Sequence, residues 1–162
     1  MTLSRRGRRK REAVARVTAL VVAAGLLLLG VAGFIPGVAD TDQTLAWGEE
    51  SSLVVLVGVF PESGWGNVVH VVMGLVGLAL SLTRQAEASR RYVLATGVLL
   101  LIWALVRFIF AVPVAAAPEG LTFGGWLHLG VGAGVSLIGF LLRISRPRKA
   151  PEDTRHEEHK AV

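Results

Sequence analysis

Four apolar stretches divide this chain of 162 residues, and each is long enough to cross a lipid bilayer. They occupy residues 17–35, 66–83, 92–112 and 124–142. The first holds 19 residues without a charge, and as a helix it rises about 29 Å, close to the thickness of the hydrocarbon core. It is longer than the ~7–15 apolar residues typical of a signal peptide, so we expect a span rather than a cleaved leader. The sequence therefore predicts an all-α membrane protein with four transmembrane helices.

The basic residues lie on alternate connections between these stretches. Of the 17 Lys and Arg residues, seven precede the first stretch, three lie between the second and third, and six follow the fourth. The other two connections, residues 36–66 and 113–123, hold six carboxylates and no Lys or Arg. Loops rich in Lys and Arg are retained in the cytoplasm during insertion. We therefore predict that both termini are cytoplasmic, and we read the net charge of +5 as topology rather than as nucleic-acid binding.

These boundaries predict one membrane domain between two polar tails. Residues 1–13 form a basic cytoplasmic tail, residues 14–144 the four-span domain, and residues 145–162 a second cytoplasmic tail. Both tails are densely charged, and we expect them to be disordered. The apolar run at residues 53–60 is too short to span, so we expect a short outer helix capped by Ser51 or Ser52. The abundance of Arg, Ala, Val and Gly is typical of a bacterial protein, which places the chain in the cytoplasmic (plasma) membrane.

An internal repeat predicts that the four helices form two tandem hairpins. In each half an acidic outer connection leads into a returning helix that opens with Trp and His: Trp65 and His70 in one, Trp126 and His128 in the other. These tryptophans, and Tyr92 at the start of the third stretch, suit the aromatic belt found at membrane surfaces. Because both halves begin on the same side, the repeat would be parallel, about an axis along the membrane normal.

Small residues mark the helix faces that we expect to pack closely. At about 100° per residue, each histidine shares a face with small residues: Gly74, Gly77 and Ser81 beside His70, and Gly132, Ser136 and Gly139 beside His128. Small residues let another backbone approach closely, so both histidines should point into the bundle. Gly130 and Gly134 form a GxxxG pair roughly 200° round from His128. That face could meet another span or another copy of the chain.

Arg107 and the two histidines are the only side chains in the four stretches that can carry a positive charge. Helical rise places all three about 6–8 Å below the outer surface. A mid-membrane arginine costs ~2.5–3.5 kcal/mol on insertion scales, so we expect Arg107 to have a polar partner. The stretches contain no Asp or Glu, which leaves a carbonyl, a neutral imidazole, water, or a loop carboxylate such as Glu62 or Asp40. The layer of His70, Arg107 and His128 is therefore either a functional site or a set of contacts that only stabilises the bundle.

Two short motifs resemble a known family. They are Asn67-Val68-Val69-His70, followed by Gly74 and Gly77-Leu78, and Leu127-His128-Leu129-Gly130 in the fourth stretch. Together they resemble a small bacterial integral-membrane family with four helices, catalogued only as a domain of unknown function. The resemblance covers roughly residues 14–142 and supports the topology, and it implies no known activity. The family pattern tends to have Asp-Asn before the second motif, where this chain has Gly124-Gly125.

Several classes of function find no support in the sequence. The chain has no cysteine, which removes disulfides, thiolate metal sites and cysteine nucleophiles. It also has no Walker motif, HExxH or G-x-S-x-G sequence. We accordingly predict no enzymatic activity, no metal site and no resident cofactor.

The leading hypothesis is a non-enzymatic four-helix module that acts through helix contacts with a second copy or another membrane protein. A second is a redox carrier in which His70 and His128 ligate one haem. A third is a small transporter or proton path that works as an oligomer. Each basic residue of the N-terminal tail should also attract anionic lipid headgroups, at ~1 kcal/mol apiece; these residues are Arg5, Arg6, Arg8, Arg9, Lys10 and Arg11.

The charge distribution generates a direct test of topology. A reporter fused after Val162, or inserted within residues 85–89, should report the cytoplasm, and one within residues 41–50 should report the outside. Compartment-specific reporter activity measures this. A cytoplasmic signal from residues 41–50 would contradict the four-span arrangement.

Overall fold

Four long helices make up the computed structural model, which describes residues 5–35, 39–40, 54–56, 60–62, 64–83, 85–111 and 119–145. The helices are α1 (Arg5–Ala32), α2 (Gly64–Leu82), α3 (Ala86–Ala111) and α4 (Glu119–Ile144). All four are long and apolar enough to cross a membrane. The predicted all-α membrane fold with four spans is confirmed, and each predicted stretch lies mostly within one helix.

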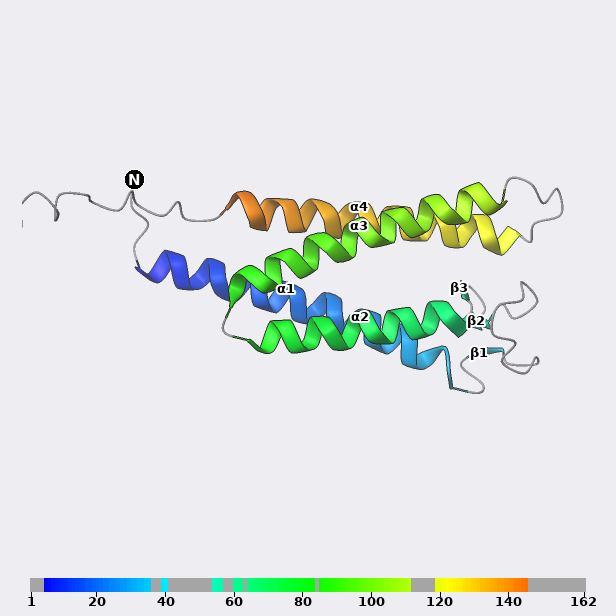
Figure 1. Cartoon of the computed structure of the whole chain (residues 1–162), viewed down its shortest axis with the longest axis horizontal. Helices are drawn as coiled ribbons and strands as arrows, with labels where there is room; N and C mark the ends of the chain where they lie inside the picture. The colour runs from blue at the N-terminus through cyan, green and yellow to red at the C-terminus, as the bar shows by residue number, and fades with distance from the viewer. Residues whose placement is uncertain are drawn as a thin grey trace, which may run out of the picture.

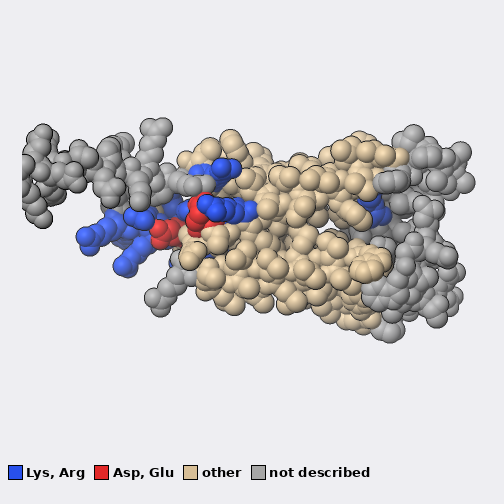
Figure 2. Space-filling model, viewed as in Figure 1, with Lys and Arg blue, Asp and Glu red and all other residues tan. Residues whose placement is uncertain are grey.

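The helices pack as two hairpins (Figure 1). Helix α1 packs most extensively against α2, and α3 against α4, while α3 also joins the two pairs through contacts with α1 and α2. The start of α1, the turn between α2 and α3, and the end of α4 lie together at one end of the bundle, which we call the basic end. Lys, Arg, Asp and Glu gather at this end, and the middle of the molecule is almost free of them (Figure 2).

Alanine and glycine allow close contact between the helix backbones. Helix α1 buries one face that repeats at helical spacing: Ala15, Ala19, Ala23, Leu26 and Gly30. Two of these alanines pack with Tyr92 and Val93 of α3 in the central apolar cluster. Close packing was predicted from the sequence for the small residues of the second and fourth stretches, but not for this alanine face of the first.

The N-terminal tail is helical where the structure describes it, so the prediction of disorder was wrong for residues 5–12. Helix α1 begins at Arg5, about three turns before the apolar stretch. Arg, Lys, Glu and Ala are good helix formers, and the Arg8 Nε donates to Glu12 Oε1 at 3.1 Å, one turn away. The helix therefore extends from the membrane stretch into the charged segment. Residues 146–162, which hold nearly all of the other predicted disordered tail, lie outside the described residues.

Residues 54–56 and 60 of the apolar run at 53–60 lie in strands, so the predicted short helix was also wrong. Strands β1 (Ala39–Asp40), β2 (Val54–Leu56) and β3 (Phe60–Glu62) form a small antiparallel sheet in the order β1-β2-β3. Val55 pairs with Pro61 in the β2–β3 register. The run is rich in valine, whose branched side chain favours extended backbone over helix. The proposed caps, Ser51 and Ser52, lie outside the described residues.

Tyr92 lies inside the bundle rather than in an aromatic belt, which corrects a third prediction. Its side chain is buried, and its hydroxyl donates to the Met73 carbonyl at 3.1 Å. The ring occupies the space that a side chain at Gly77 would fill. Trp65 and Trp126, by contrast, are exposed near the ends of their spans, as a belt requires.

A matched pair of glycines tests whether close approach stabilises the bundle. A Cβ at Gly74 would lie 2.7 Å from the Leu27 backbone nitrogen, whereas one at Gly25 would have no atom of another described helix within 4 Å. Gly74→Ala should therefore destabilise the protein by about 1–3 kcal/mol, the usual effect of overpacking. Gly25→Ala should be neutral or slightly stabilising, because alanine is the better helix former. Unfolding in detergent measures both, and equal stabilities would contradict the packing described here.

Candidate functional site

The two histidines of the predicted polar layer meet at the junction between the hairpins. His70 comes from α2 and His128 from α4, and their ring centroids are 5.9 Å apart with the planes inclined by 15°. Both side chains are buried. Each histidine lies on the small-residue face of its helix, and that face is turned toward the bundle. The ring contact therefore links helices that belong to different hairpins.

Arg107 of α3 completes the layer. Its side chain is buried, and the guanidinium packs so closely on Gly124 that a Cβ there would lie 2.9 Å from an arginine Nη2. The Gly124 carbonyl accepts a hydrogen bond of 2.7 Å from His128 Nδ1. A carbonyl can only accept, so Nδ1 carries the proton, and in the neutral ring the lone pair is on Nε2. His70 interacts electrostatically with both Arg107 and His128. The structure thus brings together all three residues predicted for the layer.

Asn67 lies next to this layer, although the sequence analysis treated it only as part of a motif. It is 1% exposed, and its Nδ2 donates to the Gly33 carbonyl at 3.4 Å, across to the end of α1. Within the described residues its Oδ1 has no hydrogen-bond partner. The sequence alone could have predicted this position, because residues three apart on a helix share a face and Asn67 lies three residues before His70. A buried amide on the same face as a buried histidine predicts a polar cluster rather than an isolated residue.

Most of the predicted packing residues lie against a neighbouring helix. Gly74 faces Leu27 of α1, Gly77 faces Tyr92 of α3, and Gly132 faces Leu101 of α3. Ser81 is buried and its hydroxyl donates to the Leu78 carbonyl of its own helix at 2.8 Å. Two further contacts on the same faces involve α3: Ser136 with Gly97, and Gly139 with Leu94.

Gly130 and Gly134 are turned away from the bundle. Both are exposed, and among the described residues no atom lies within 4 Å of a Cβ added at either position. Helix α4 is also the least covered of the four spans. Of its 18-residue apolar segment 17% is buried in the bundle, against 39% for the corresponding segment of α3. The GxxxG face therefore packs against no other helix of this chain within the described residues.

The six basic residues predicted to meet lipid headgroups lie on the first turns of α1. All are exposed, and Arg11 reaches across to donate to the Ser145 carbonyl at the end of α4, at 2.9 Å. The structure does not bring these residues near the polar layer, which lies at the opposite end of the bundle.

The chemistry open to the polar layer follows from its donors. Two imidazoles offer two nitrogen ligands, and no cluster of three or more His, Cys, Asp or Glu side chains occurs in the described parts of the chain. A bare metal ion usually takes more ligands than two imidazoles supply. The pair therefore suits either hydrogen bonding within the bundle or a cofactor that brings its own ligands, such as haem.

A double-mutant cycle tests whether the layer acts as one unit. A neutral imidazole can accept a hydrogen bond from a guanidinium, so His70→Ala should remove a partner from a buried arginine and destabilise the protein by ~1–3 kcal/mol. Adding Arg107→Leu should recover part of that loss, since the arginine is then gone. Unfolding free energies of the two single variants and the double variant in detergent measure the coupling.

Ser81→Ala provides the control for this cycle. Ser81 is buried on the same face of α2 but bonds only to its own helix, so its effect should add to that of Arg107→Leu. Strict additivity between His70→Ala and Arg107→Leu as well would mean that the layer residues do not interact.

Comparison with known proteins agrees with the topology and the motifs. A family model described as a domain of unknown function (DUF4383) matches residues 16–141, which include both histidine motifs and all four helices in whole or in large part. This match confirms the resemblance drawn from the motifs. No curated protein and no solved structure matches the chain. A match over most of the chain shows that this protein belongs to the family described as domain of unknown function DUF4383.

Proposed function

We propose that this protein is a non-enzymatic four-helix membrane module that pairs with a second copy of itself through helix α4. The observation that carries the proposal is the open glycine pair, because Gly130 and Gly134 face outward with no neighbour in the described chain. Elsewhere in the fold, the glycine pairs Gly30/Gly33 and Gly74/Gly77, three residues apart, pack against another helix. The same geometry on an outward face supports a helix from outside the chain.

A second copy is the partner that best fits this face. Helices with a GxxxG pair associate through matching small-residue faces and cross in a right-handed sense at about −40°. Two copies of the same helix can therefore pack against each other. Two copies inserted by the same charge rule would have the same orientation, and a two-fold axis along the membrane normal would place the two α4 helices side by side. The exposed surface of α4 supports this choice, since it is the span least covered by its own chain.

The ring pair favours a second candidate, a haem-binding redox carrier. His128 Nδ1 donates to the Gly124 carbonyl, which is how a metal-bound histidine is commonly oriented with Nε2 toward the metal. The two ring centroids lie 5.9 Å apart, so both histidines could contribute a ligand to one group. When bound, haem would supply one-electron chemistry, and these residues would hold its iron.

Gly134→Leu tests the leading proposal. A bulky side chain keeps a second backbone away from this face, so the dissociation constant of the dimer in lipid vesicles should rise by ~10-fold or more, as measured by energy transfer between labelled copies. Gly25→Leu is the matched control, because Gly25 is also open but has Val21 and Leu29 one turn away on either side. A monomeric wild-type protein, or equal effects of the two substitutions, would rule out the α4 dimer.

The same purified protein distinguishes the second candidate. An intense Soret absorption that disappears in His70→Ala and in His128→Ala would identify the haem carrier. A featureless visible spectrum together with a dimer sensitive to Gly134→Leu would leave the helix-contact module.

A further inference from the structure

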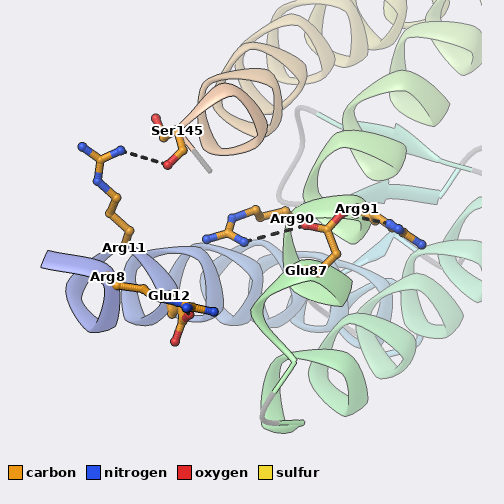
Figure 3. A network of polar contacts seen from close by, with 7 residues as sticks. All are labelled: Arg8, Arg11, Glu12, Glu87, Arg90, Arg91 and Ser145. Atoms are coloured by element: carbon orange, nitrogen blue, oxygen red, sulfur yellow. Dashed lines mark hydrogen bonds and ion pairs between the residues drawn. The ribbon is translucent and has the colours of Figure 1, made fainter. Parts of the chain in front are cut away.

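Two adjoining pockets at the basic end share one buried arginine. The first has a volume of about 310 Å³ and is lined by Arg90, Arg91, Leu94 and Arg143. The second, of about 190 Å³, is lined by Lys10, Arg11, Val14, Arg90, Leu142 and Ser145. Arg90 of α3 belongs to both, so its side chain lies between the start of α1 and the end of α4 (Figure 3). The pockets therefore form one basic recess where three helices end or begin.

Arg90 has spare hydrogen-bonding capacity in this recess. The residue is 7% exposed, and within the described residues its Nε has no hydrogen-bond partner. The nearest carboxylate is Glu87, whose Oε2 lies 3.7 Å from Arg90 Nη1, while its Oε1 accepts from Arg91 at 3.0 Å. A buried guanidinium with an unused donor is costly, which indicates that a ligand from outside the chain supplies acceptors.

The charge around the recess is strongly positive. Its lining carries five basic side chains and no carboxylate. Glu87 lies beside Arg90 and Arg91 and offsets one charge, and Glu12 is paired with Arg8, neither of which lines the recess. Helical geometry also directs Arg143 toward α3, because it lies about 20° from Gly132, which packs on that helix. The excess positive charge favours an anion.

We infer that this recess binds the phosphate of an anionic phospholipid headgroup. Guanidinium groups match phosphate oxygens with paired hydrogen bonds, and basic pockets between the ends of membrane helices are typical sites for anionic headgroups. The apolar residues Val14, Leu94 and Leu142 lie beside the charged ones. These apolar side chains can contact the glycerol and acyl part of a lipid, whereas free phosphate has no apolar group that would contact them. This site differs from diffuse attraction to the exposed tail, because it depends on particular residues of three helices.

Lipid titration of the detergent-solubilised protein tests the inference. Phosphatidylglycerol should bind in a saturable way by native mass spectrometry and raise the melting temperature, and phosphatidylcholine with the same acyl chains should do neither. Arg143→Gln should weaken phosphatidylglycerol binding roughly fivefold, the effect of about one interfacial charge. Arg90→Gln should weaken it by ~10-fold or more, because a buried charged hydrogen bond is lost. Arg143 is exposed, so its variant should fold normally even if Arg90→Gln does not.

Arg16→Gln is the control, since it removes the same charge from a residue of α1 that lines neither pocket. It should leave phosphatidylglycerol binding within about twofold of wild type. Equal weakening by Arg16→Gln and Arg143→Gln would mean diffuse attraction and would overturn the site. Stabilisation by inorganic phosphate that matches phosphatidylglycerol at equal concentration would identify a free anion as the ligand and overturn the lipid assignment.

Discussion

Close contact between helix backbones is the constraint on which the rest of this bundle depends. Between helices in lipid there is little hydrophobic driving force, because the surrounding chains are as apolar as leucine. Packing must come from van der Waals contact, and that contact is best where side chains are absent or small. Here the alanine face of α1 and the glycines of α2, α3 and α4 provide it. The helices approach only because these positions lack bulk.

The polar layer follows from this packing. Once α2 and α4 are held by their small-residue faces, His70 and His128 have to meet, and Arg107 is brought against Gly124. In a low-dielectric interior each of these groups needs a hydrogen-bonding or charged neighbour. His128 Nδ1 donates to the Gly124 carbonyl, its ring lies beside that of His70, and Arg107 packs on Gly124. The layer therefore joins the two hairpins at the end where their loops are acidic.

The two surfaces proposed for contacts outside the chain do not compete. Arg143 lies about 180° from Gly134 around helix α4, so the basic recess faces the bundle while the glycine pair faces away. Each also depends on a different kind of force. The recess uses concentrated positive charge at a helix end, whereas the glycine face uses shape in the middle of the membrane. A second copy on α4 would therefore leave the recess open to lipid.

Hydropathy alone determined the number of spans, because membrane insertion responds to that local property. The internal repeat predicted their pairing into two hairpins. Helical periodicity also placed each histidine on a small-residue face. Only the tertiary structure decided that Tyr92 is buried against Gly77, that Asn67 reaches across to the end of α1, and that Arg90 lies between two pockets. These depend on which helix faces which, and that relation is not encoded within any one stretch. The small sheet was not predicted because strands are stabilised by pairing with one another, although the valines of residues 53–60 favour extended backbone.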